Sequence, residues 1–164
     1  MVRAIAVEKG RPGPNLAARV LLGYEARYRR RGRLITDIGE DILLDLPEAA
    51  ELPDGGALVL EDGRRVAIVA APEPLAEIRG DSLPRLAWHI GNRHAPCDVR
   101  ADRLLIQRDH VLEEMVVRLG GQVTHVEAPF RPEGGAYGHG RVHGHAHAAH
   151  ADDDPNAHIP HRHG

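Results

Sequence analysis

The second half of the chain decides the fold, in the stretch LAEIRGDSLPRLAWHIGNRHAPCDVRADRLLIQRDHVLEEMVVRLGGQVTHVEA at residues 75–128. Two segments in it have apolar residues at helical spacing, and short strand-like segments lie before, between and after them. The order β-α-β-β-α-β is the ferredoxin-like arrangement. The expected strands are Leu75–Arg79, Asp98–Arg100, Leu104–Gln107 and Val123–Ala128.

Cap signals mark the ends of both expected helices. Asp81 or Ser82 can cap the start of the first helix, and Gly91-Asn92 can end it. The second helix begins at Asp109 and is stopped by Gly120-Gly121. These signals predict two short helices between the strands.

Upstream of this stretch the chain has β character. Short strand-like segments separated by turn residues predict a small sandwich or barrel. At Ala71-Pro72-Glu73-Pro74, two prolines discourage a helix or a central strand and favour a short linker. The strand-like segments are Val2–Val7, Ala18–Leu22, Leu34–Thr36, Asp41–Leu46, Ala57–Leu60 and Val66–Ala70.

The end of the chain has a different composition. Eight of the twelve histidines lie in residues 139–164, which contain almost no large apolar side chain and cannot bury enough surface to offset the entropy of ordering. We therefore expect an α+β chain. It has a small all-β domain at residues 1–72, a ferredoxin-like βαββαβ domain at 75–138, and a disordered, flexible His-rich tail at 139–164.

Charge and composition exclude several classes of protein. The formal charge is −3, and protonation of all twelve histidines would bring it to +9. The net charge is therefore unusually sensitive to mild acid and to anything that binds imidazole. The single cysteine excludes a disulfide framework and a cysteine-based zinc finger. No apolar run is long enough for a membrane span, and the start lacks a secretory signal, so we expect a cytoplasmic protein.

Histidines at the helix ends are candidate metal ligands. His94 follows the end of the first helix and can offer a ring nitrogen outward, although a hydrogen bond to a backbone carbonyl is the alternative. His89 is a weaker candidate, off the apolar stripe of its helix. His110, in the first turn of the second helix, can be a ligand or an ordinary polar residue. Cys97 is more readily a small buried residue than a ligand, and His125 has a structural role in its strand.

The tail offers imidazoles separated by single residues, as in His143-Gly-His145-Ala-His147. Such spacing lets neighbouring rings reach one ion with little loop-closure cost. Imidazole suits zinc, copper and nickel alike, so the ligands alone do not name the metal. The irregular spacing is unlike an engineered tag. The candidate tail ligands are His139, His143, His145, His147 and His150.

An arginine-rich run at residues 27–33 is the main competing signal. Its five arginines could contact the phosphates of an RNA, although the overall charge is not basic. Arg29, Arg31 and Arg33 alternate, as they would on one solvated strand face or against an acidic protein partner. The sequence has no phosphate-binding glycine loop, no H-E-x-x-H and no local nucleophile motif, so an enzyme is the least favoured class.

Several motifs together resemble those of the UreE family, urease accessory proteins that serve as nickel metallochaperones. The combination is specific, and the resemblance covers nearly the whole chain. The matching stretches are Arg30–Arg33, Trp88–His94, Asp109–Met115 and Pro129–Gly138, followed by the histidine tail.

This resemblance implies a non-catalytic homodimer that carries Ni²⁺, with Zn²⁺ or Cu²⁺ able to bind the same ligands. It implies an N-terminal domain that binds a peptide or partner and a metal-binding C-terminal domain. His94 would lie at the dimer interface and bind one ion jointly with its mate, and His110 would be an additional ligand. Some relatives have another histidine where this chain has Arg108, and an aliphatic residue where it has Cys97.

The implied recipients are the urease accessory GTPase and, through it, the urease apoprotein, with no nucleic acid and no membrane involved. A general buffer or store for Ni, Zn or Cu is an alternative, and an RNA-binding module that uses the arginine run is a weaker one.

Overall fold

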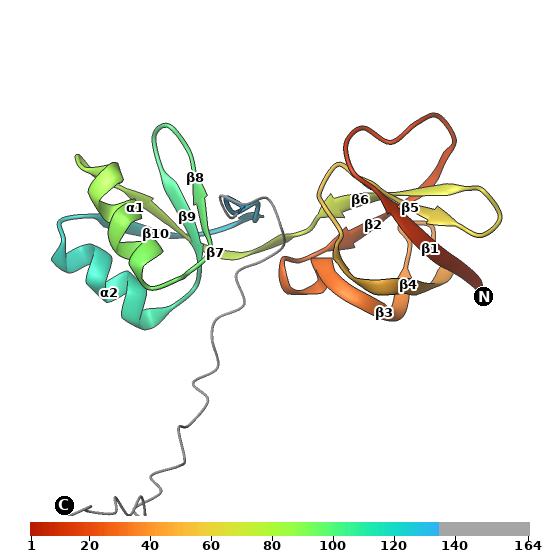
Figure 1. Ribbon diagram of the computed structural model, residues 1–164. Coiled ribbons are helices and arrows are strands. Elements are labelled where there is room, and N and C mark those ends of the chain that lie inside the picture. Colours follow the sequence, from red (N-terminus) through yellow and green to blue (C-terminus); the bar gives the residue numbers. More distant parts are fainter. Residues whose placement is uncertain (135–164) are drawn as a thin grey trace, which may run out of the picture.

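The computed structural model describes residues 1–134, which form two domains in succession along the chain (Figure 1). The expected flexible tail and its candidate ligands lie outside these residues. The first domain contains β1 (Val2–Glu8), β2 (Leu16–Leu22), the 3-10 helix η1 (Glu25–Arg27), β3 (Tyr28–Ile35), β4 (Asp41–Glu51), β5 (Ala57–Leu60) and β6 (Arg65–Ala70). The second contains β7 (Pro72–Arg79), α1 (Leu83–Asn92), β8 (Cys97–Val99), β9 (Leu104–Gln107), α2 (His110–Arg118) and β10 (Gln122–Pro129).

In the described part of the chain, the first domain is a six-stranded sheet with the order β2-β6-β5-β1-β4-β3. Ile42, Leu44 and Leu46 alternate along β4 and are buried in its core, as a half-buried strand requires. The edge strand β2 meets the turn after β3, where the Asp37 N–H donates to the Arg19 carbonyl and the Arg19 N–H donates to Oδ1 of Asp37, each at 2.8 Å. This contact satisfies the backbone groups of Arg19, which an edge strand would otherwise leave unpaired.

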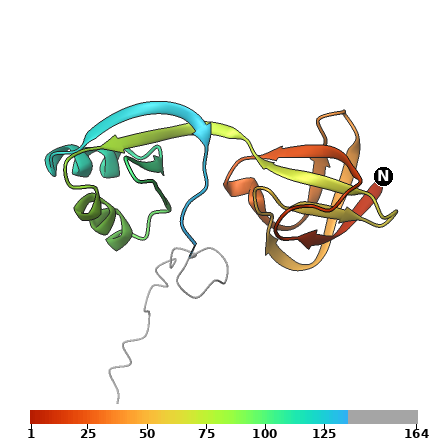
Figure 2. The same ribbon diagram turned by 90° about the horizontal axis from the view of Figure 1, so that it is seen from above.

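The expected linker at residues 71–74 is instead the start of a strand. Pro72 and Pro74 both lie in β7 and pair with β10, opposite Pro129 and Glu127. Prolines are tolerated there because this end of β7 pairs only with β10, whereas β9 joins its other side from Leu75 onward. Figure 2 shows β7 running directly out of the first domain into the second.

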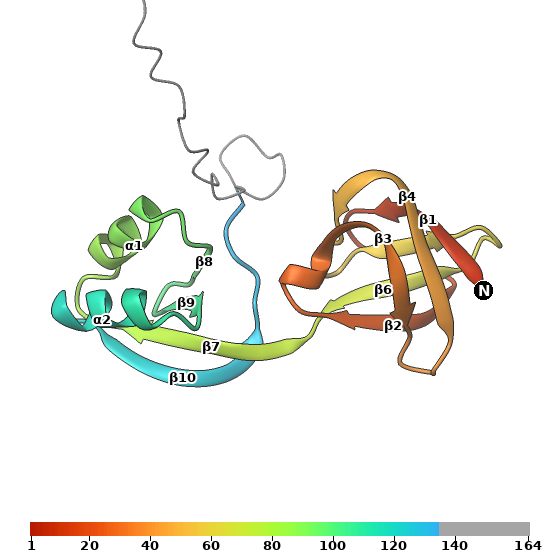
Figure 3. The same cartoon turned by 90° about the horizontal axis from the view of Figure 1, so that it is seen from below.

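The second domain has the predicted ferredoxin-like topology. Its antiparallel sheet has the order β10-β7-β9-β8, and both helices cover the same face (Figure 3). Ile78 and Ile106 on this face pack against Leu86 and Ile90 of α1 and against Val116 of α2. This packing fixes the ends of α1 and α2, where the candidate ligands lie.

The opposite face of this sheet is divided between apolar and charged residues. Leu75 and Leu105 are covered by Phe130 and by Tyr24 of the first domain, whose ring meets Phe130 edge-on at 5.2 Å between centroids. After β10, residues 130–134, here called the strap, lead from one edge of the sheet to the other. At the far edge the backbone N–H of Glu133 donates to the carbonyl of Cys97 in β8 at 2.9 Å.

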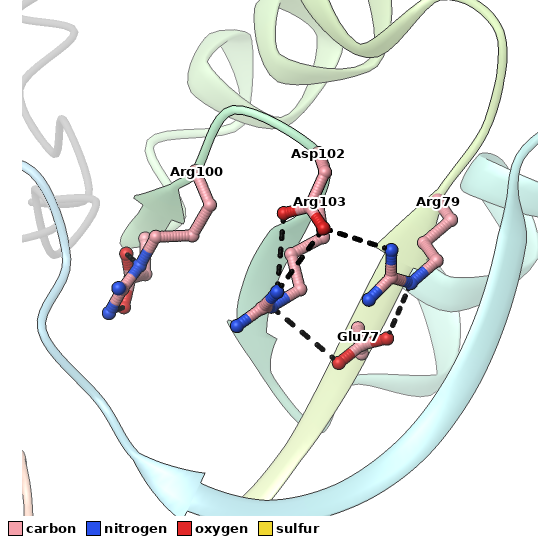
Figure 4. Close-up of polar contacts among 6 residues, drawn as sticks. Glu77, Arg79, Arg100, Asp102 and Arg103 are labelled. Carbon is pink, nitrogen blue, oxygen red and sulfur yellow. Dashed lines mark hydrogen bonds and ion pairs between the residues drawn. The ribbon is translucent and has the colours of Figure 1, made fainter.

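The charged half of that face carries a closed ring of ion pairs (Figure 4). Arg79 bridges Glu77 at 2.8 Å and Asp102 at 3.2 Å, and Arg103 contacts the same two carboxylates. Because these side chains are partly exposed, the ring adds little stability. It joins the β8–β9 turn to β7, and each of its charges already has a partner.

Candidate metal site

His94 lies just beyond α1 in a left-handed backbone conformation. Its φ is +56°, and its N–H donates to the carbonyl of Gly91 at 3.0 Å, which closes the end of the helix. The helix ends at Asn92, as the Gly91-Asn92 signal predicted, and the left-handed position two residues later falls on the histidine. Such a conformation costs a residue with a side chain about 1 kcal/mol. The surrounding structure therefore holds the exposed His94 in a fixed backbone geometry.

The start of α1 also differs from the cap prediction. Ser82 is in the N-cap position, but its side chain makes no capping hydrogen bond. Pro84, near the first position of the helix, supplies the fixed φ that favours a helix start.

Exposed apolar side chains occupy the outer surfaces of both helices. Trp88 of α1 is 62% exposed and Val111 of α2 is 60% exposed. The half-buried His89 meets the Trp88 ring edge-on, with 4.9 Å between ring centroids, so its position is set partly by an aromatic contact. Both side chains are available for contact with another protein surface.

His110 occupies the first position of α2. Asp109 caps the helix by accepting from the Leu112 N–H at 2.9 Å, while Glu113 accepts from the N–H of Asp109 at 2.9 Å. The His110 side chain is 84% exposed and lies 3.7 Å from a carboxylate oxygen of Glu114. That carboxylate offsets the positive end of the helix, which otherwise disfavours a cation.

The sequence neighbours of His94 and His110, but neither histidine itself, line one groove. The residues on either side of each histidine, Arg93 and Ala95 in one case and Asp109 and Val111 in the other, line this groove. Within residues 1–134, no three His, Cys, Asp or Glu side chains converge as a ready-made metal site. A metal here would need ligands from the tail, from water or from a second chain.

Cys97 behaves as a packing residue. It is half-buried against the helix-side core, and burial, with the nearby Asp98 and Glu133 carboxylates, raises the pKa of its thiol to about 11. Because the thiolate is the form that binds metal, Cys97 is a poor ligand at neutral pH. This agrees with the sequence-based preference for a small buried residue.

His125 is the histidine whose surroundings the sequence did not reveal. It lies in β10 as expected, but its ring is 56% exposed and its Nε2 lies 2.6 Å from an oxygen of Glu113. Burial alone would raise the pKa of Glu113, yet hydrogen bonds from His125, from the Asp109 N–H and from Arg108 leave it lowered. The carboxylate therefore faces His125 in its charged form.

The arginine-rich run lies largely in β3, which begins earlier than the predicted Leu34–Thr36. Arg33 makes a bidentate pair with Asp41 at 2.7 and 2.8 Å, and Arg31 lies 3.7 Å from Asp45. Both carboxylates are on the neighbouring β4. These partners occupy charges that an RNA phosphate would need, which removes much of the support for RNA binding.

Among the described residues, neither helix has the length and apolar character needed to span a membrane.

Comparisons with known proteins match both domains. The family model described as UreE urease accessory protein, N-terminal domain, matches residues 2–71, and the model for the C-terminal domain matches residues 73–163. The urease accessory protein UreE of Ruegeria sp. (strain TM1040) is 56% identical over 124 residues, covering 76% of this chain and 70% of that protein. The protein of the same name from Paracoccus denitrificans (strain Pd 1222) is 57% identical over 131 residues, covering 80% and 83%.

Proposed function

The chain belongs to the UreE family of urease accessory proteins, and from this premise we propose that it is a nickel metallochaperone that delivers Ni²⁺ to the urease active site. Its role in urease maturation follows from the family, and an accessory protein is distinct from the urease catalyst. In the proposal, residues 75–138 and the tail bind the metal, while residues 1–72 contact a partner. Zn²⁺ and Cu²⁺ can compete for the same imidazoles.

One observation carries this proposal: the root of the tail is attached beside His94. The strap ends with the Glu133 N–H bonded to Cys97, only three residues after His94 in the sequence. His139 follows six residues later, and six residues reach at most about 20 Å. Tethering at this range raises the effective concentration of the tail imidazoles near His94.

A homodimer supplies the remaining ligands. If a two-fold axis passes near His94, each chain contributes one imidazole to a shared ion. The exposed Trp88 and Val111 suit such an interface, because an isologous contact buries the same patch twice. The further candidate ligands are His110, His89 and the tail histidines His139, His143, His145, His147 and His150.

Delivery requires that the metal be released. Two imidazoles fill only part of a coordination shell, and water or tail rings complete it, so an acceptor can replace the ligands one at a time. Only neutral imidazole binds metal, and acid therefore weakens binding through competition by protons. The proposed acceptors are the urease accessory GTPase and the urease apoprotein, in the cytoplasm.

A metal buffer or store is the second candidate, favoured by the eight histidines of residues 139–164. The two functions differ in which ligands are essential. A buffer loses its function when the tail histidines are removed, whereas a chaperone keeps its shared site at His94.

The test is calorimetric titration of the full-length chain with Ni²⁺ at neutral pH, with the eight tail histidines replaced by alanine. We expect one high-affinity ion per two chains, which is lost in His94→Ala and retained in the neighbouring control Asn92→Ala. Unchanged affinity and stoichiometry in His94→Ala would refute the shared site.

A further inference from the structure

The groove between α2 and β10 brings together two histidines that lie far apart in the sequence. His110, Glu113, Glu114 and Val117 occupy one face of α2 at i, i+3, i+4 and i+7. All four line an open groove together with His125 on the facing strand.

His125 is turned towards α2 by the register of the sheet. It pairs with Ala76, whose side chain belongs to the core beneath the helices, so the His125 ring emerges on the helix side. There its Nε2 lies 2.6 Å from Oε1 of Glu113. The Glu113 side chain is only 13% exposed, whereas that of His125 is 56% exposed, so the carboxylate lies behind the ring and the ring faces solvent.

Glu113 is itself held in place. Its Oε2 accepts from the Asp109 N–H at 2.9 Å and from Nε of Arg108 at 3.3 Å. An ionised carboxylate only accepts hydrogen bonds, so the Nε2 of a neutral His125 carries the proton. The lone pair is then on Nδ1. Metal-binding histidines commonly have this arrangement, in which one ring nitrogen donates to a carboxylate and the other binds the ion.

We propose that His125 binds a divalent cation through Nδ1 and that, with His110, it forms a second metal site in the α2–β10 groove. Glu113 is the positioning residue of this site. The inference deepens the proposed function, because it assigns His110 a partner for the same cargo metal. It does not depend on the shared ion at His94.

The surroundings predict a weak, exchangeable site. No third ligand is assembled in residues 1–134, so water completes the shell. His110 is free to turn towards His125, because its side chain is 84% exposed, and Glu114 adds negative charge nearby. Arg108 and Arg118 also line the groove and oppose a cation, although Arg108 is paired with Glu113. Imidazole ligands suit nickel, copper and zinc.

The first test is Ni²⁺ titration of the full-length chain with alanine at the eight tail histidine positions. We expect each chain to bind one further Ni²⁺ ion, with lower affinity than the ion shared at His94. His125→Gln keeps a polar group beside Glu113 but removes the imidazole, and it should weaken the second ion at least about tenfold. His110→Gln should have the same effect, and the double variant should weaken binding little further. Thr124→Ala, on the opposite sheet face, is the control.

The second test follows the ring of His125 by nitrogen NMR during addition of Zn²⁺. We expect the Nε2–H tautomer before addition and a shift of the Nδ1 resonance on binding, with weaker binding in Glu113→Gln. An unmoved Nδ1 resonance, or full affinity for the second ion in His125→Gln, would overturn the inference. Loss of this ion in His125→Gln with no effect of His94→Ala would instead refute the shared site and leave the groove site standing.

Discussion

At the scale of single residues, the candidate ligands are set by backbone geometry that the sequence only partly reveals. The sequence identified His94 and His110 as helix-end residues, because glycine and aspartate mark such ends. It missed that His94 itself adopts the left-handed conformation beyond α1, since local signals favour glycine at such a position. It also missed the contact of His125 with Glu113, which needs the register of β10 against β7.

The left-handed backbone at His94 gives a stability prediction. His94→Gly should be more stable than His94→Ala by about 1 kcal/mol, because glycine adopts positive φ without steric cost. Both variants should lose the shared metal ion. Urea unfolding of the two variants measures the difference, and greater stability of the alanine variant would contradict the assigned conformation.

Asp54 gives a pH prediction. Burial would raise the pKa of this carboxyl group, but the Ala70 N–H and the guanidinium of Arg131 leave its pKa below the ordinary value for aspartate. A lowered pKa stabilises the folded state above the unfolded value, and this stabilisation is lost as pH falls through the folded pKa. We therefore expect Asp54→Asn to be less stable than wild type at pH 6, with the gap shrinking towards pH 3. Urea midpoints at both pH values test this, and a gap that widens in acid would contradict it.

At the scale of elements, most strands were predicted, but the strand character of residues 72–74 was not. Alternating apolar residues located β4 and a continuous apolar run located β6, whereas Pro72 and Pro74 suggested a linker. Proline is a local signal, but pairing with β10 is a long-range contact that local patterns do not contain. The first half of β3 was not predicted, because it consists mainly of arginines. Their charges are balanced by carboxylates only through the pairing of β3 with β4.

The end of α2 depends on two glycines. Gly120 has a φ of +88°, and a Cβ on Gly121 would lie 2.6 Å from the Cγ1 atom of Val116. Gly121→Ala should therefore destabilise the protein by about 1–3 kcal/mol through overpacking. Gly91→Ala is the matched control, because it lies within α1 with open space around it and should be neutral or stabilising. Thermal unfolding compares the two, and equal effects would argue against close packing at Gly121.

The strap depends on Phe130, which is fully buried between Tyr24, Leu75 and Leu105. Phe130→Ala should destabilise the protein by about 3–5 kcal/mol. It should also break the hydrogen bond between Glu133 and Cys97 of β8, and so lower the effective concentration of the tail imidazoles near His94. Hydrogen exchange at the Glu133 amide reports the release, and an amide that stays protected in the variant would show that the strap is held without Phe130.

At the scale of the whole molecule, the fold places the strap next to β8, close to the end of α1. The first domain contributes Tyr24 and Asp54 to hold the strap, so both domains help to position the tail root. In the proposed dimer, this region of one chain contacts the same region of the second chain. Within residues 1–134, no three His, Cys, Asp or Glu side chains converge on a metal site, and in the proposal the second chain supplies the missing ligands.

Self-association should depend on the apolar helix surface. Trp88→Glu should shift the dimer towards monomer and weaken the shared metal site with it, because both need the second chain. Ile38→Glu is the control, since Ile38 is 68% exposed but lies in the first domain. Sedimentation velocity measures the shift, and a dimer that persists in Trp88→Glu would place the interface elsewhere.

The central claim is that two chains share one nickel ion through His94. Anomalous scattering from a crystal of the full-length protein soaked in Ni²⁺ tests it most directly. We predict a nickel peak on a two-fold axis, within coordination distance of the His94 rings of both chains. Two His94 side chains far apart in the assembled dimer, with no metal between them, would contradict the account.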